Sequence, residues 1–275
     1  MSDTITFINH ATALIQINGV NIITDPVYSR TVAFIFPRLK QPGILFENLP
    51  RIDYVLISHN HYDHLNLKTL RRLRRAHQPT IIVPKGVATY ARRTGFNNII
   101  EMNWWEGFEN NGMKVTCVPA KHFSGRTLWD RNKSVFCGYV IETRNSTVYF
   151  AGDTAYADFF KELSNRFSID IALLPIGAYK PEWFQSVHMN PIQAVQAFLD
   201  LRAKHLIPIH WGTFKISDEP SAEPPILLKK ESGQKKIMDE VHILENGEQF
   251  CFSTREHPKI ISGRVRQPST PTETV

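Results

Sequence analysis

Short apolar runs alternate with polar segments along most of the chain, and their spacing predicts both strands and helices. Runs at 4–8, 13–17 and 21–25 are typical of strands, and a turn at 18–20 separates the last two. From residue 53 onward, predicted strands alternate with predicted helices. The strands are expected at 53–58, 80–84, 114–119, 136–142, 147–152, 170–177, 205–211 and 241–252, and the helices at 67–76, 86–95, 155–167, 191–201 and 221–236. This order is typical of a layered α/β fold, either a doubly wound sheet or two sheets between helices.

Two segments depart from this pattern. Residues 28–46 form a long apolar loop with two prolines, and we expect it either to cover the core or to serve as a substrate-entrance or membrane-touching loop. Residues 256–275 lack periodicity and are predicted to be a disordered tail. Because no linker of useful length interrupts 1–255, we expect that range to be a single domain.

Composition narrows the class of protein further. The chain has no apolar run of about 18 residues, which excludes a membrane-spanning helix. Its N-terminus carries an acid where a signal peptide has basic residues, so we expect a cytoplasmic protein. Three cysteines without CxxC spacing favour neither a disulfide framework nor a cysteine-based zinc site. The net charge of +6 favours anionic partners, and the arginine-rich stretch 70–77 is either a solvated helix face or an anion or membrane-surface patch.

Metal-competent side chains follow four of the predicted strands directly. The strand at 53–58 leads into the sequence HNHYDH, and three later strands lead into one histidine or aspartate each. Strand ends at one edge of a sheet are where a rigid scaffold meets open loops, so these groups are expected to converge there. The converging set is His59, His61, Asp63, His64, His122, Asp153 and His210. Five other histidines fit no ligand pattern and are interpreted as structural: His10, His77, His205, His242 and His257.

A pair of divalent metal ions explains this concentration of donors. Imidazole and carboxylate groups suit zinc, with manganese or iron as alternatives. Two ions about 3.5–4 Å apart need roughly three protein ligands each and a bridging carboxylate, and they leave a bridging water to be activated. A single structural zinc is a poorer match, because seven donors oversupply one tetrahedral site.

The HxHxDH pattern, followed by a distant histidine, an aspartate in a GDT turn and a late histidine, resembles the metallo-β-lactamase superfamily. The resemblance implies a four-layer αββα sandwich with a dinuclear centre at its edge. It also implies that His59, His61 and His122 hold the first metal and that Asp153 bridges. The second metal would be held by Asp63, His64 and His210.

Further stretches resemble the N-acylphosphatidylethanolamine-hydrolysing phospholipase D family. They are NHATALIQINGVNIITDP, VLISHNHYDHL, NWWE, RTLWDRNKS, FAGDTAY, PIGAYKPEWF, HMNPIQAV and IHWGTF, and they span about residues 7–225. The resemblance implies zinc-dependent cleavage of a phospholipid phosphodiester by a hydroxide that bridges two zinc ions, giving phosphatidate and an N-acylethanolamine. Alternatives are a hydrolase of a small soluble anionic ester (a lactonase or phosphodiesterase), an RNA-processing nuclease and a non-enzymatic metal-binding module.

The phospholipase hypothesis assigns roles to further residues. Asp63 and Asp153 would stay ionised and would orient the hydroxide or accept its proton, and His188 would act as an acid or a phosphate donor. Tyr179 and Trp183 would line the leaving-group side or form a core lid, and Arg126 would bind phosphate or remain solvated. Peripheral contact with the inner face of a membrane is expected, nucleic acid is not expected as a partner, and a homodimer is compatible with the sequence.

Overall fold

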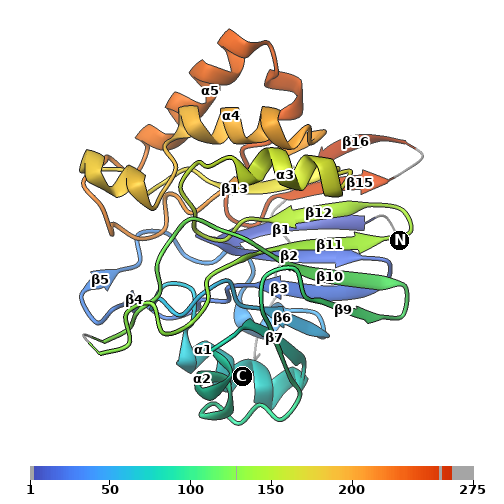
Figure 1. The fold of residues 1–275 in the computed structure, drawn as a ribbon, viewed down its shortest axis with the longest axis vertical. Coiled ribbons are helices and arrows are strands. Elements are labelled where there is room, and N and C mark those ends of the chain that lie inside the picture. The colour runs from blue at the N-terminus through green and yellow to red at the C-terminus, as the bar shows by residue number, and fades with distance from the viewer. Residues whose placement is uncertain (1–2, 128, 254–255, 262–275) are drawn as a thin grey trace, which may run out of the picture.

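The computed structural model describes residues 3–127, 129–253 and 256–261, and two β-sheets pack face to face at its centre (Figure 1). The larger sheet runs in the order β16 (Glu256–Ile261), β15 (Gln249–Ser253), β1 (Asp3–Asn9), β2 (Thr12–Ile17), β3 (Val20–Thr24), β6 (Tyr54–Leu56), β7 (Thr80–Pro84) and β8 (Ile99–Met102). The smaller sheet runs in the order β14 (His205–Ile209), β13 (Ile171–Pro175), β12 (Thr147–Phe150), β11 (Gly138–Thr143), β10 (Met113–Val118) and β9 (Gly107–Asn110).

Helices cover the outer faces of both sheets. One pair packs on the larger sheet, and the others lie on the side of the smaller sheet, so the layers are αββα, as the resemblance implied (Figure 1). The first pair is α1 (Leu67–His77) and α2 (Ala88–Arg92), and the others are α3 (Phe159–Arg166), α4 (Pro191–Leu201) and α5 (Glu223–Lys235). Short 3-10 turns lie at η1 (Phe46–Asn48), η2 (Glu182–Ser186) and η3 (Met238–Glu240).

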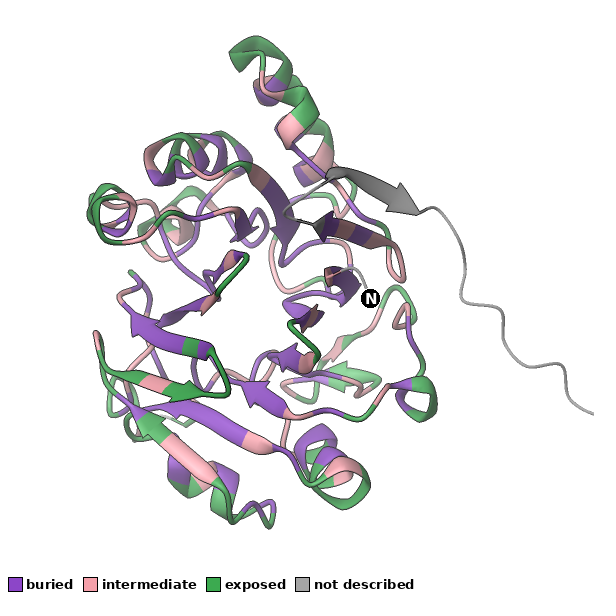
Figure 2. Cartoon of the chain, turned by 90° about the vertical axis from the view of Figure 1, so that its right-hand side faces the viewer, coloured by how far each residue is buried: buried purple, intermediate pink, exposed green. Residues whose placement is uncertain are grey.

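Both faces of the larger sheet are buried, because successive residues of a strand point to opposite faces. Ile15 packs into the core between the sheets, whereas its neighbour Leu14 packs under the helices together with Leu70 and Leu73 of α1. Figure 2 shows the buried residues concentrated on the strands and the exposed ones on the helices and loops. This double burial explains why the strands read as apolar runs with little polar alternation.

Three parts of the structure differ from the sequence prediction. The segment 28–46 contains a hairpin of β4 (Thr31–Val32) and β5 (Phe36–Pro37), where only a loop was expected. Strands β8 and β9 were missed because their residues are only partly buried and carry little apolar pattern. Residues 256–261, which were expected to belong to a disordered tail, form β16 and pair with β15, and residues 262–275 lie outside the described part.

The strand directions bring chemically useful residues to one edge. Strands β3, β6 and β7 are mutually parallel, as are β12, β13 and β14. Two antiparallel steps make β1 run in the same direction as β3, and two make β10 run in the same direction as β12. The loops that leave the carboxyl ends of these strands therefore gather at the same rim of the sandwich, as the strand-end argument predicted.

Gly152 lets the two sheets approach closely at this rim. It has φ +61°, and a Cβ there would lie 2.5 Å from Ser58 Cβ and 3.1 Å from the carbonyl oxygen of Cys137. Ser58 immediately precedes His59, and Gly152 immediately precedes Asp153. Only glycine therefore allows the loops after β6 and β12 to lie at this distance.

We expect Gly152→Ala to destabilise the fold in two ways. An alanine at positive φ costs about 1–2 kcal/mol, and forcing a methyl group against Ser58 adds about 1–3 kcal/mol. Gly112→Ala is the matched control, because Gly112 has φ +74° and nothing within 4 Å of the added Cβ. Urea unfolding of both variants measures the difference, and equal losses of unfolding free energy would show that the close approach is unimportant.

Candidate metal centre

All seven predicted donors lie together at the rim of the sandwich. His59, His61, Asp63 and His64 lie in the loop after β6, and the other three follow β10, β12 and β14. They form two sets, which we call the first group (His59, His61 and His122) and the second group (Asp63, His64 and His210). Asp153 lies between them: its Oδ2 is 3.0 Å from His64 Nε2, 3.3 Å from His210 Nε2, and 3.8 Å from both His59 Nε2 and His122 Nε2.

The three imidazole rings of the first group lie close together and are neutral. Nδ1 of His61 lies 2.8 Å from Nε2 of His59 and 3.2 Å from Nε2 of His122. Burial, reinforced by the neighbouring imidazoles, lowers the pKa of His61 to about 3 and that of His59 well below its usual range. Burial likewise lowers the pKa of His122. At neutral pH these rings therefore carry no charge, which is the state that binds a metal.

The outer hydrogen bonds of these rings determine which nitrogen faces the site. Nδ1 of His122 lies 2.8 Å from the carbonyl oxygen of Val187, which can only accept, so Nδ1 carries the proton. Nε2 of His122 then presents a lone pair to the first group. A backbone carbonyl or carboxylate behind a ligating imidazole is the usual arrangement around protein-bound metals.

Asp25 orients one imidazole of each group. Its Oδ2 lies 2.6 Å from Nδ1 of His64 and accepts a 2.5 Å hydrogen bond from the hydroxyl of Ser58. Because that hydroxyl donates to Asp25, it accepts from Nδ1 of His59, 2.9 Å away. Both rings therefore keep a proton on Nδ1 and turn Nε2 toward Asp153.

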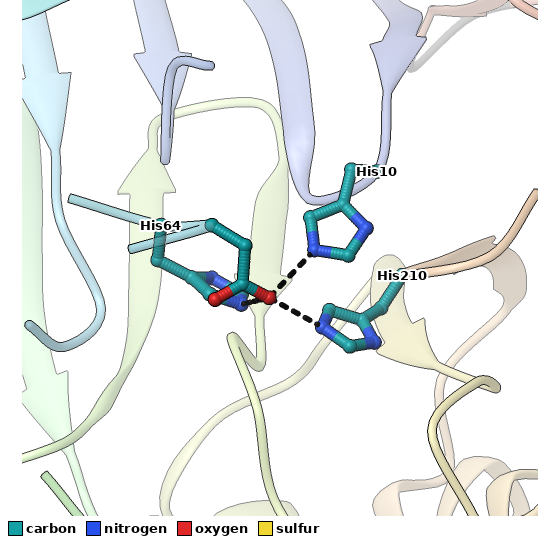
Figure 3. A group of neighbouring side chains, drawn as sticks. His10, His64 and His210 are labelled. Atoms are coloured by element: carbon teal, nitrogen blue, oxygen red, sulfur yellow. Dashed lines mark hydrogen bonds and ion pairs between the residues drawn. The ribbon is translucent and has the colours of Figure 1, made fainter. Parts of the chain in front are cut away.

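The second group surrounds one carboxylate oxygen. Oδ2 of Asp63 lies 3.5 Å from Nε2 of His64 and 3.5 Å from Nε2 of His210. Figure 3 shows His64, His210 and also His10 turned toward this oxygen. Although burial opposes the change, Asp153 and Asp63 raise the pKa of His64 well above its ordinary value and that of His210 to about 9. Protonated rings thus supply the positive charge that these buried carboxylates need.

A metal ion fits this arrangement better than protons do. Among the described residues, Nε2 of His64, Nε2 of His210 and Oδ1 of Asp153 are buried and make no hydrogen bond. Buried polar atoms are normally paired, and several unpaired ones within a single cluster indicate a missing partner. Imidazole nitrogens and carboxylate oxygens form the donor set, and no cysteine takes part. This set suits zinc, iron or manganese.

His188 lies beside the centre in an uncharged form. Its Nδ1 lies 4.0 Å from Oδ2 of Asp153 and makes no hydrogen bond to a described residue. Burial outweighs the nearby carboxylate and lowers the pKa of His188 well below its usual range. At neutral pH the ring therefore carries a single N–H, which it can donate.

The three predicted substrate-binding residues have different surroundings. Tyr179 is buried and donates its hydroxyl to Glu223 at 2.6 Å, so it belongs to the core lid rather than to the site. Trp183 is 68% exposed and packs on Phe184. Nη1 of Arg126 donates to main-chain carbonyls, including those of Asn60 and Leu65 at 2.8 Å. These bonds stabilise the metal-binding loop and occupy part of the guanidinium group, so not all of its N–H groups could bind a phosphate.

Two residues of the centre were missed by the sequence analysis. His10 was interpreted as structural, yet its Nε2 lies 3.0 Å from Oδ2 of Asp63. Burial lowers the pKa of His10 to about 3, so its ring is neutral. Asp25 was not considered. Both follow a strand at the same rim, His10 after β1 and Asp25 after β3, so the rule that found the other donors also applies to them.

The comparison with known proteins agrees with this geometry. Residues 20–211 match the family model described as the beta-lactamase superfamily domain. The chain belongs to the beta-lactamase superfamily. Igni18, a metallo hydrolase from the archaeon Ignicoccus hospitalis, shares the fold with a TM-score of 0.72 at 23% identity, covering 92% of this chain and 99% of that one. The superfamily resemblance and the αββα fold are thereby confirmed.

Two phospholipases are similar in sequence. The N-acyl-phosphatidylethanolamine-hydrolyzing phospholipase D of Saccharomyces cerevisiae, a mitochondrial protein, is 36% identical over 86% of this chain and 53% of its own length. The N-acyl-phosphatidylethanolamine-hydrolyzing phospholipase D 1 of Caenorhabditis elegans is 35% identical over 85% of this chain and 69% of its own length. The chain spans about half to two thirds of the length of the curated relatives that it matches.

We expect Asp25→Asn to weaken metal binding without unfolding the protein. Asp25 accepts hydrogen bonds from the Ser58 hydroxyl, the Ser58 main-chain N–H and His64. An asparagine side chain has one accepting oxygen and cannot accept all three, so His59 and His64 lose their orientation. The loss of such outer partners reduces metal affinity by about 10–100-fold. Asp53→Asn is the control, since Asp53 accepts a backbone hydrogen bond at the other end of β6. Competition against a zinc chelator measures the affinity, and equal affinities in both variants would contradict the role of Asp25.

Proposed function

We propose that the protein is a zinc-dependent phosphodiesterase of the phospholipase D type. As a member of its superfamily it is a metal-dependent hydrolase. The proposed substrate is an N-acylphosphatidylethanolamine, and the products are phosphatidate and an N-acylethanolamine. The observation that carries the proposal is the two-group donor set, found in a chain that is 35–36% identical to two phospholipases of this activity.

The donor groups suggest where two ions would be held. The first group would bind one zinc ion, the second group the other, and Asp153 would contact both. When bound, such a pair supplies a nucleophilic hydroxide near neutral pH and neutralises charge on the phosphate. Manganese or iron would suit the same donors.

The protein's own residues would prepare the attack. Despite burial, the neighbouring imidazoles hold the pKa values of Asp63 and Asp153 well below their usual range, so both remain ionised and would orient the hydroxide. Neutral His188 would donate an N–H to a phosphate oxygen from the side of the α4 loop. The His188 ring packs against Phe184, with ring centroids 6.1 Å apart, and little of its side chain is exposed.

The surface of the hairpin β4–β5 is an argument for an amphiphilic substrate. Its tip exposes two large apolar side chains, Phe34 at 85% and Ile35 at 72%. Ala33 and Phe34 both have positive φ, which non-glycine residues rarely adopt. The Phe34 ring lies 5.7 Å from that of Tyr62, a residue of the metal-binding loop. The apolar tip therefore stands directly beside the candidate metal centre.

A basic cavity adjoins the hairpin. It has a volume of about 580 Å³, and Tyr62 forms part of its wall. The described residues that line it include no acidic side chain and five basic ones: Arg30, Lys68, Arg71, Arg72 and Arg126. Positive charge beside exposed apolar side chains is the combination that binds anionic lipid surfaces. We therefore propose peripheral contact with a membrane, at the inner face if the protein is cytoplasmic.

A soluble anionic ester is the second candidate substrate. The same basic cavity would attract a small phosphodiester or an acidic lactone without any membrane. Within the described residues, no helix is long and apolar enough to cross a bilayer.

We expect zinc-loaded protein to hydrolyse N-acylphosphatidylethanolamine in mixed micelles to phosphatidate and N-acylethanolamine, detected by mass spectrometry. Glycerophospho-N-acylethanolamine, which lacks the two glycerol-linked acyl chains, should be cleaved far more slowly, because it loses the apolar contacts of the hairpin. Asp153→Asn is the negative control. Cleavage of soluble esters alone would replace the phospholipase assignment with the second candidate.

The hairpin makes a separate prediction about membranes. A protein with Phe34→Ser and Ile35→Ser should bind phosphatidylglycerol vesicles at least tenfold more weakly, since burying each apolar side chain contributes about 1.5–3 kcal/mol. Ile226→Ser on α5 is the matched control, because Ile226 is 63% exposed and belongs to another face. Vesicle sedimentation measures the binding, and an unchanged affinity in the double variant would exclude the hairpin as the membrane contact.

A further inference from the structure

We infer that His10 is a positioning residue that holds the second group in its metal-binding geometry. The inference rests on the two-ion site of the proposed function. It concerns a histidine of the β1–β2 turn that lies outside the HxHxDH motif, with a ring nitrogen within 4.8 Å of the ligand atoms of all three members of the second group.

The side chain of His10 restrains Asp63. Its Nε2 lies 3.0 Å from Oδ2, and a carboxylate can only accept, so Nε2 carries the proton and donates. The side chain of His10 is 2% exposed, so water does not compete for this hydrogen bond. Because its Nε2 proton points at Asp63, His10 acts on the ion through that carboxylate and not as a ligand itself.

The main chain of His10 restrains His210. Its carbonyl oxygen accepts a 2.8 Å hydrogen bond from the amide of His210, and its own amide donates to the hydroxyl of Thr213 at 2.8 Å. The two imidazole rings also pack together, with centroids 4.0 Å apart (Figure 3). His10 and His210 both have positive φ, at 49° and 60°, so this contact holds two strained backbone positions together.

His10 thus joins two donors that are far apart in sequence. Asp63 comes from the loop after β6 in the larger sheet, and His210 from the loop after β14 in the smaller one. Of the two donor groups, the described contacts of His10 reach only the second: its ring packs against His64 and His210, and its Nε2 donates to Asp63. A positioning role therefore predicts an effect on one ion and not on the other.

The experiment titrates metal-free protein with Co²⁺ and follows visible absorption and calorimetry. The wild type should bind two ions. His10→Phe keeps a ring against His210 but removes the donor, and it should weaken one site by about 10–100-fold while the other changes less than about twofold. In His10→Gln the amide nitrogen can occupy the place of Nε2, so affinity should stay within about threefold of the wild type.

Further variants keep the experiment decisive. His10→Asn, whose amide is too short to reach Asp63, should behave like His10→Phe and replaces it if the phenylalanine variant does not fold. His242→Phe is the matched control, because His242 is also buried but pairs with His205 away from the centre. Thermal melting of the metal-free proteins verifies folding.

The possible outcomes separate this inference from the proposed function. Equal weakening of both sites, no weakening in His10→Phe, or failure of His10→Gln to retain affinity would overturn the positioning role while the wild type still binds two ions. A wild type that binds fewer than two Co²⁺ ions would overturn the proposed two-ion site, and the inference with it.

Discussion

Buried imidazoles and carboxylates converge at one rim of the β-sandwich, and their mutual electrostatics require positive charge between them. In the metal-free protein, protons on His64 and His210 meet part of this requirement, as their raised pKa values show. The first group has no such solution, because burial and mutual repulsion keep its three rings neutral, and His59 and His122 turn an unprotonated Nε2 inward. Divalent cations satisfy both groups at once, and every functional conclusion depends on this constraint.

The fold meets the constraint by bringing strand ends from two sheets to the same place. Parallel neighbours in each sheet direct their carboxyl ends to one rim, and Gly152 lets the loops of the two sheets touch there. Asp25 orients His64 directly and His59 through the Ser58 hydroxyl. His10 contacts Asp63 through its side chain and His210 through its main chain. The proposed substrate side is separate: an apolar hairpin tip and a basic cavity adjoin the metal-binding loop without supplying metal ligands.

Much of this was predictable from sequence because the signals are local. Strand β7 and helix α4 match their expected bounds. An apolar run marks the strand, and a proline marks the start of the helix. The donors of HxHxDH were recognisable for the same reason. The hairpin was not, because Ala33 and Phe34 adopt positive φ without a glycine signal. His10 and the role of Tyr179 depend on contacts with residues 63, 210 and 223, which only the tertiary fold brings near.

The most direct measurement of the central claim is the number and position of bound metals in crystals of zinc-loaded protein. Anomalous scattering at the zinc edge should give two peaks about 3.5–4 Å apart. One peak should lie among His59, His61 and His122 and the other among Asp63, His64 and His210, with Asp153 contacting both. A rim without anomalous signal, or with one peak held by a single group, would contradict the account.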